Sequence, residues 1–288
     1  MTILRTLRPA HWVKNFLVLA PLFFSGKLIE PAVAVRALLA FGVFCAVSSA
    51  VYAFNDYMDA ERDRSHEFKK DRPYASGRLS AAALGAIIAV CLLLAATGCL
   101  ALPWGVAGMA GAYVAGMTLY SLVLKRVQVI GVVIIALGML ARIFAGAVAI
   151  DVCVSSWVLP CTFFLACYVV TGKRIFDAGP RGGGKPREKG EGRREKGEGV
   201  LFFWFSGAAA LCYYIFYSFN HEAIMKFGTR WLELTAAPVA LGLWRYSRIV
   251  TARNRPKREH FQTLLLDPVI IFSLALWVGC FFFIVYLF

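Results

Sequence analysis

Apolar runs long enough to cross a membrane follow one another along most of this 288-residue chain. A helix of about 20 apolar residues spans the hydrocarbon core of a bilayer, with its backbone groups hydrogen-bonded inside the segment. Hydrophobic residues make up 59% of the chain, more than a soluble core would use. The sequence therefore predicts an all-α integral membrane protein in contact with a lipid bilayer. We predict nine transmembrane helices, with eight as the alternative, at 12–29, 32–55, 81–102, 104–124, 128–150, 153–172, 200–219, 229–250 and 267–288.

Basic residues gather on one side of this arrangement. All but five of the 31 Lys and Arg residues lie at the N-terminus or at the connections that follow even-numbered spans. By the positive-inside rule, the N-terminus and these connections face the cytoplasm, at the plasma (inner) membrane. The formal net charge of +14 then reflects topology and attraction to anionic lipid, so we predict no nucleic-acid partner.

Three aspartates, Asp56, Asp59 and Asp63, directly follow the second predicted span at positions i, i+3 and i+7. On a helix this spacing puts the carboxylates within about 60° of one face, so they can converge on one or two divalent cations. Mg²⁺ prefers oxygen ligands that include substrate phosphates, and Lys69 and Arg72 could bind the remaining phosphate charge. The pattern predicts a magnesium–pyrophosphate site at the membrane surface; the alternative is a solvated helix end with local ion pairs.

One segment, 179–199, differs in composition from the rest of the chain. It is rich in glycine and mixed charge, and the run Arg-Glu-Lys-Gly-Glu-Gly occurs twice in it. Such a segment cannot bury a core. We therefore predict a disordered cytoplasmic loop, inserted into a single transmembrane domain that covers 1–288.

The aspartate cluster has the form Asn-Asp-x-x-Asp-x-x-x-Asp and is followed by His-x-x-Lys-x-x-Arg-Pro. It resembles the first aspartate-rich motif of the UbiA superfamily of intramembrane prenyltransferases. Arg8-Pro9-x-x-Trp12-x-Lys14-Asn15 and Tyr120-Ser121-x-x-Leu124-Lys125 are similar to two motifs of its decaprenyl-phosphate phosphoribosyltransferase branch. Further similarities, spread over nearly the whole chain outside 179–199, are Arg142-x-x-x-Gly146, Ser156-Trp157, Lys173-Arg174 and Arg245-Tyr246.

This resemblance implies a nine-helix bundle around a central cavity open to the lipid and the cytoplasm. It also implies magnesium-dependent transfer of 5-phosphoribose from 5-phosphoribosyl 1-diphosphate to a polyprenyl phosphate of the decaprenyl type, as in cell-wall precursor biosynthesis, with pyrophosphate leaving. Two alternatives stay open: a transferase that moves a prenyl group from a prenyl diphosphate to an aromatic or other acceptor, and a non-catalytic relative. A homo-oligomer stays open as well, since apolar helices do not encode oligomeric state.

The resemblance also assigns site residues. Asp56, Asp59 and Asp63 are the predicted catalytic and magnesium-binding groups. The predicted substrate-binding residues share a positive charge or a polar side chain, and they are Lys14, Asn15, Asn55, His66, Lys69, Arg72, Tyr120, Lys125, Arg142 and Lys173. Lys14 is equally explained as a topology determinant, and Tyr120 as an interfacial anchor.

Two positions bear on how this site would work. Arg142 lies inside an apolar span, where an unpaired guanidinium costs several kcal/mol, so it should face a phosphate in a polar cavity or a structural ion-pair partner. Gly131 stands where the resemblance leads us to expect a second aspartate at the start of the fifth span. Without that second aspartate, more of the metal binding would depend on Asp56, Asp59 and Asp63.

Overall fold

The computed structural model describes residues 2–65, 69–124, 128–177, 191–252 and 260–286. Over these ranges the chain is helical and has no β-strand, as the sequence predicts. Its contacts divide it into two compact units, Met1–Val154 and Ser155–Phe288. That one transmembrane domain covers 1–288 stays a prediction.

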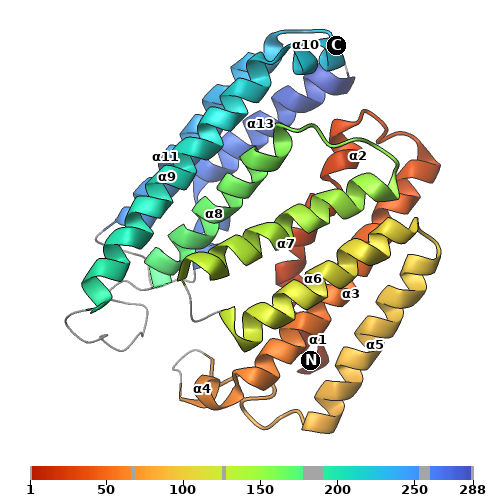
Figure 1. Cartoon of the computed structure of the whole chain (residues 1–288), viewed down its shortest axis with the longest axis vertical. Helices are drawn as coiled ribbons and strands as arrows, with labels where there is room; N and C mark the ends of the chain where they lie inside the picture. Colours follow the sequence, from red (N-terminus) through yellow and green to blue (C-terminus); the bar gives the residue numbers. More distant parts are fainter. Residues whose placement is uncertain (1, 66–68, 125–127, 178–190, 253–259, 287–288) are drawn as a thin grey trace. The chain divides into compact units, whose positions relative to one another are not determined.

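The first unit is built around helix α3 (Pro31–Met58), which packs against α5 (Ala81–Leu100), α6 (Trp104–Leu122) and α7 (Gln128–Ala149) (Figure 1). Pro31 occupies the first turn of α3, where its missing N–H costs nothing. α5 begins after Ser80, whose side-chain oxygen accepts the N–H of Ala83 at 3.2 Å. Apolar side chains between these helices form the core of the unit, among them Phe44, Val47, Val106, Tyr113 and Ala145.

The chain before α3 does not form the long helix predicted at 12–29. It forms α1 (Thr2–Leu7), the 3-10 helix η1 (Pro9–Val18) and the short helix α2 (Ala20–Phe24). Pro21 cannot donate a backbone hydrogen bond, so it lies in the first turn of α2 instead of inside a long helix. η1 packs against both α3 and α7.

η1 can approach α7 because of Gly146. A Cβ atom at this position would lie 1.9 Å from the carbonyl oxygen of Val18, and that oxygen belongs to the backbone, which cannot rotate away. Only glycine leaves room for so close a contact. The Arg142-x-x-x-Gly146 motif of the sequence therefore marks the place where η1 crosses α7.

We expect Gly146→Ala to destabilise the protein by about 3 kcal/mol, because the added methyl group forces η1 off α7. Thermal unfolding of the purified protein in detergent measures the effect. Gly108→Ala, inside α6, is the matched control, since a Cβ there meets nothing within 4 Å and alanine favours the helix. A Gly146→Ala variant as stable as the Gly108→Ala variant would contradict the close contact.

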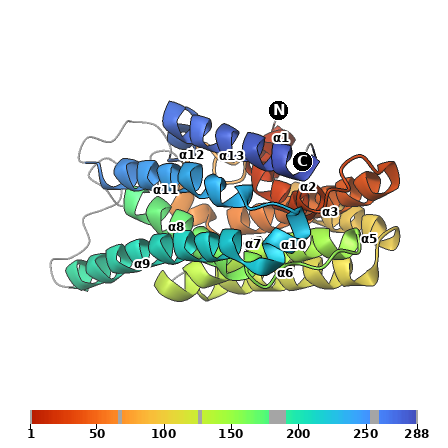
Figure 2. The same cartoon turned by 90° about the horizontal axis from the view of Figure 1, so that it is seen from above.

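The second unit begins with α8 (Val158–Asp177), which packs along α9 (Glu191–Phe219). After α10 (His221–Phe227) and the 3-10 helix η3 (Trp231–Thr235), α11 (Ala236–Thr251) packs against α8, α9 and α13 (Pro268–Tyr286). Figure 2 shows α11 and α13 side by side, joined through the short helix α12 (His260–Leu265). Tyr168 of α8 stacks on Phe203 of α9 with ring centroids 4.4 Å apart, which fixes this helix pair.

The predicted loop 179–199 differs in part from the structure. Residues 179–190 lie outside the described residues, whereas helix α9 already begins at Glu191. Glu, Arg and Lys are good helix formers, so this end of the charged repeat can extend the apolar helix that follows it. The second copy of the repeat, at 194–199, therefore lies within helix α9.

The prediction of nine transmembrane helices is wrong when helices are counted by their length and their apolar composition. Six helices among the described residues meet these criteria: Pro31–Met58, Ala81–Leu100, Val129–Ala149, Val158–Asp177, Gly197–Phe219 and Pro268–Tyr286. The span predicted at 12–29 is broken near Pro21, and glycine, tryptophan and tyrosine lower the hydropathy of α6. The span predicted at 229–250 is split between η3 and the 16-residue α11, which carries Arg245 and Arg248.

Large apolar side chains lie on the outer faces of these helices. Leu93 of α5 and Leu274 of α13 are 64% and 58% exposed, and most of both helices is unburied. Exposed apolar faces of this extent suit contact with lipid tails. The chain is thus a multi-pass membrane protein.

Candidate active site

The aspartate cluster lies where α3 ends and α4 (Ala60–Arg64) begins, as Figure 1 shows. The structure differs here from one continuous helix, because α3 ends at Met58 and Asp59 follows with φ −98° and ψ 3°. Backbone hydrogen bonds still bridge the junction: the Asp59 N–H donates to the Asn55 carbonyl at 2.9 Å, and the Asp63 N–H donates to the Asp59 carbonyl at 2.8 Å. The interruption therefore leaves Asp56 and Asp63 close enough to share a partner.

That shared partner is Arg72. Its Nη1 lies 2.5 Å from Oδ2 of Asp63 and 3.3 Å from Oδ1 of Asp56. Arg8 forms a second ion pair with the same Oδ1 of Asp56. Both carboxylates are buried, each 3% exposed, and two like charges can be buried together only when cations compensate them. Asp59, between them in the sequence, is half-buried.

The two buried carboxylates each have an oxygen atom that could bind a divalent cation. The arginines use Oδ1 of Asp56 and Oδ2 of Asp63, so one oxygen of each carboxylate is not engaged by Arg8 or Arg72. Within the described ranges, no three His, Cys, Asp or Glu side chains are already grouped to hold a metal. The arrangement suits Mg²⁺ bound by one or two carboxylates and completed by substrate phosphates, which is how this ion is usually held.

Basic side chains surround the carboxylates. Lys69 is half-buried, and burial together with the charge of Arg72 lowers its pKa, against the smaller opposing effect of Asp63. Burial likewise lowers the pKa of Arg8, while the nearby Asp56 acts in the opposite direction. The structure thus brings Asp56, Asp63 and Arg72 into contact and places Lys69 within the electrostatic influence of Arg72 and Asp63, whereas their binding of metal and substrate stays a prediction.

Asn55, a predicted substrate-binding residue, also makes a contact within the first unit. Its Oδ1 accepts a hydrogen bond from the hydroxyl of Ser121 in α6. This bond ties the end of α3 to the end of α6, next to the half-buried Tyr120. Ser121 was not among the predicted site residues, although its place beside Tyr120 in the motif was a signal for it.

Asn15 and Arg142 form an internal cluster instead of the predicted substrate contacts. Arg142 donates to Asn15 Oδ1 at 2.8 Å, to the Gly138 carbonyl at 2.6 Å and to the Tyr113 hydroxyl at 3.0 Å. Asn15 in turn donates to Ser48 Oγ at 3.0 Å. Asn15 is fully buried and Arg142 is 4% exposed, so their polar groups are satisfied inside the unit. We therefore reassign both from substrate binding to the support of η1, and the ion-pair alternative for Arg142 is replaced by neutral partners.

Lys14 lies on η1, outside the six candidate transmembrane helices, and is half-buried. Burial first of all, and then the positive charges of Arg142 and Arg8, lower its pKa to about 8. Three cationic groups close enough to repel one another favour an anion at this place. Docking of an acceptor phosphate at Lys14 stays a prediction.

Three other predicted substrate-binding residues are His66, Lys125 and Lys173. His66 and Lys125 lie outside the described residues. Lys173 belongs to the second unit, where it is exposed near the end of α8, four residues before Asp177. Gly131 is buried in α7, so α7 brings no carboxylate at the position of the expected second aspartate.

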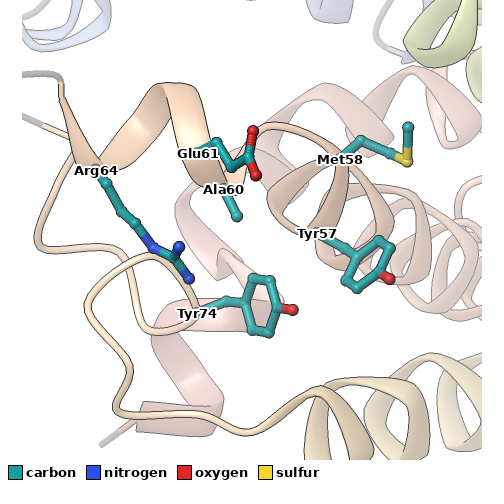
Figure 3. A pocket seen from close by; sticks show the side chains of 6 residues that line it. All are labelled: Tyr57, Met58, Ala60, Glu61, Arg64 and Tyr74. Atoms are coloured by element: carbon teal, nitrogen blue, oxygen red, sulfur yellow. The ribbon is translucent and has the colours of Figure 1, made fainter.

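An open pocket of about 330 Å³ lies at the same helix junction. Its lining residues come from the end of α3, from α4 and from the following connection, as Figure 3 shows, and they are Tyr57, Met58, Ala60, Glu61, Arg64 and Tyr74. Tyr57 and Tyr74 contact each other with ring centroids 5.6 Å apart. The buried aspartates are not among its lining residues, so the pocket lies beside the cluster.

Two aspartates of this multi-pass membrane protein are buried at the end of a helix and bridged by an arginine. These are features expected of a transferase whose active site lies in the membrane. Residues 16–175 match the model of the UbiA prenyltransferase family. The decaprenyl-phosphate phosphoribosyltransferase of Mycolicibacterium smegmatis is 30% identical over 96% of this chain and 90% of its own length. That of Corynebacterium glutamicum is 29% identical over 99% of this chain and 86% of its own length.

The fold agrees with these relationships. A UbiA homolog from Archaeoglobus fulgidus, solved with bound GPP and Mg²⁺, superimposes with a TM-score of 0.68 and 18% identity, over 99% of both chains. The chain belongs to the UbiA prenyltransferase family and is a membrane-embedded transferase.

Proposed function

We propose that the protein transfers 5-phosphoribose from 5-phosphoribosyl 1-diphosphate to a polyprenyl phosphate of the decaprenyl type, in a magnesium-dependent reaction that releases pyrophosphate. The observation that carries this proposal is the pair of buried carboxylates, Asp56 and Asp63, bridged by Arg72 at the end of a membrane helix. The similarity to two decaprenyl-phosphate phosphoribosyltransferases over nearly the whole chain supports the choice of substrates.

In this reaction an oxygen of the acceptor phosphate bonds to C1 of the ribose. The bond from C1 to the diphosphate oxygen breaks, and its electron pair leaves with the pyrophosphate. Mg²⁺, when bound, would neutralise charge on the departing pyrophosphate. Asp56, Asp59 and Asp63 would hold the ion, while Arg72 and Lys69 would bind phosphate oxygens by charge-assisted hydrogen bonds.

Lys14 would hold the acceptor. It lies on η1 near Arg8 and Arg142, and this cationic surrounding suits a phosphate carried by a lipid. The negative charge of a bound phosphate would raise the lowered pKa of Lys14 and so favour its charged form. Tyr120, His66, Lys125 and Lys173 stay predicted substrate contacts.

The orientation follows the distribution of charge. We place the N-terminus and the aspartate cluster at the cytoplasmic face of the plasma membrane, because Arg8 contacts Asp56 at the end of α3 and because Lys and Arg residues are frequent in both segments. A homo-oligomer remains a prediction.

A second function, prenyl transfer from a prenyl diphosphate to an aromatic or other acceptor, is favoured by one observation. The chain shares its fold with a homolog that binds GPP and Mg²⁺. Both donors release pyrophosphate, and the group that is transferred becomes a delocalised cation. The aspartate cluster alone therefore suits either donor. The absence of a carboxylate at Gly131 leaves only one aspartate-rich cluster in the first unit, which weakens the prenyl alternative more.

We expect label from 5-phosphoribosyl 1-diphosphate to enter the lipid phase when polyprenyl phosphate and Mg²⁺ are supplied to the purified protein. EDTA should abolish this transfer, and restored Mg²⁺ should recover it, since the diphosphate must be neutralised to leave. Parallel reactions contain GPP and an aromatic acceptor. Transfer from GPP with none from the phosphoribosyl donor would establish the alternative, and transfer from neither would contradict both.

A further inference from the structure

The N-terminal segment is fastened to α3 on both sides of Arg8. The Ser49 hydroxyl donates to the Leu7 carbonyl at 3.0 Å, and the Trp12 indole N–H donates to the same hydroxyl oxygen at 3.0 Å. These bonds fix the backbone immediately before and shortly after Arg8. The segment therefore has a defined position over the second half of α3.

The side chain of Arg8 follows one face of α3 from this anchor. Ser49, Tyr52 and Asp56 are spaced i, i+3 and i+7, so they lie along the same side of the helix. The guanidinium carbon of Arg8 lies 5.5 Å from the ring centre of Tyr52, and its Nη2 ends at Asp56. The arginine thus reaches from the anchor at Ser49 to the buried carboxylate.

The backbone of Arg8 is in an unfavourable conformation. Its φ of 52° and ψ of 59° are left-handed, which costs a residue with a side chain about 1–2 kcal/mol. Pro9 follows directly, and a residue before proline disfavours helical angles. Such a conformation persists only because the contacts around it hold it. Its effect is to turn the arginine side chain toward Asp56.

The buried charge of Asp56 is not compensated by Arg8 alone. Arg72 also contacts its Oδ1, and Arg72 has Asp63 as a second partner. The side chain of Arg8 is 18% exposed, so it keeps some access to its surroundings. A divalent cation at Asp56 would repel Arg8, and the released guanidinium would lie beside the phosphates that the cation brings.

We propose that Arg8 is a diphosphate-binding residue: Asp56 holds it next to the site, and it moves from this carboxylate to the diphosphate when magnesium-bound donor arrives. This role rests on the proposed function for the identity of the donor. It makes the N-terminal Arg-Pro motif part of the donor site, while Lys14 of the same motif serves the acceptor.

The test uses the full chain in lipid nanodiscs and measures binding of Mg²⁺ alone and of inorganic pyrophosphate with Mg²⁺ by calorimetry. In Arg8→Gln, pyrophosphate affinity should fall by about tenfold or more, whereas affinity for Mg²⁺ alone should be kept or rise, because a competing cation is gone. Arg8→Lys should lose less pyrophosphate affinity, since lysine keeps the positive charge but lacks the several N–H donors of the guanidinium group. Arg5→Gln, at an exposed residue of α1, is the matched control and should bind both as wild type does.

Two results would overturn the inference. One is wild-type pyrophosphate affinity in Arg8→Gln. The other is a parallel fall in both affinities together with a lower Tm, which would make Arg8 a structural residue. The proposed function fails separately: if pyrophosphate binding depends on Arg8 but the wild-type protein transfers no phosphoribose to lipid, Arg8 keeps its role and the substrates are different.

Discussion

Asp56→Asn should reduce phosphoribosyl transfer by at least about 10²-fold, because the amide has nearly the shape of the carboxylate but neither its charge nor its affinity for a divalent cation. Asp56 is the buried carboxylate that both Arg8 and Arg72 contact. The fold should remain, since Arg72 keeps its ion pair with Asp63. The measurement is transfer of label from 5-phosphoribosyl 1-diphosphate to polyprenyl phosphate, with donor binding measured on the same samples.

Asp71→Asn is the matched control for this variant. It makes the same chemical change in the connection between α4 and α5, where the Asp71 side chain is 70% exposed and lies 3.9 Å from a surface arginine, Arg78. A surface pair of this kind contributes little, so we expect activity close to wild type. Equal activity of Asp56→Asn and Asp71→Asn would remove the aspartate cluster from the mechanism.

The second large effect is expected at Arg142. Arg142→Met should lower the free energy of unfolding by about 3 kcal/mol or more, because it leaves the buried Asn15 side chain, the Tyr113 hydroxyl and a backbone carbonyl without their donor. Arg142→Lys should be only a partial replacement, since one ammonium group cannot reproduce the directions of the guanidinium donors. Thermal unfolding in detergent measures both variants.

A double-mutant cycle with Asn15→Leu separates this internal role from substrate binding. If Asn15 and Arg142 support each other, the double variant should be clearly more stable than the sum of the two single losses predicts. Two results would instead restore Arg142 as a phosphate ligand. One is that the stability losses of the two single variants simply add, and the other is that the Arg142→Met variant keeps the wild-type Tm but binds the acceptor poorly.

The helical membrane fold and the cluster of charged groups at the end of α3 could be predicted from the sequence. The length of the apolar runs requires helices in lipid, and the spacing of Asp56 and Asp63 brings them to one side even though the helix is interrupted between them. The interruption itself has no clear sequence signal, because Asp59 can end a helix or continue one.

The sequence could not assign partners across long separations. Arg142 and Asn15 are 127 positions apart, and each looks like a ligand for substrate when read alone. Their pairing depends on the crossing of η1 over α7 at Gly146, which is a property of the packed backbone. The count of transmembrane helices was wrong for a different reason, since Pro21 interrupts the apolar segment before α3, which folds as the short helices η1 and α2.

The short separations within the aspartate cluster bear on how this protein is made. Arg72 reaches Asp63 nine residues away and Asp56 sixteen residues away, and Arg8 also belongs to the first unit. Closing loops of this size costs little entropy compared with joining distant parts of a chain. We therefore expect the cluster to assemble while the ribosome is still synthesising the helices after Val154. The buried carboxylates would then be paired with their arginines before the later segments enter the bilayer.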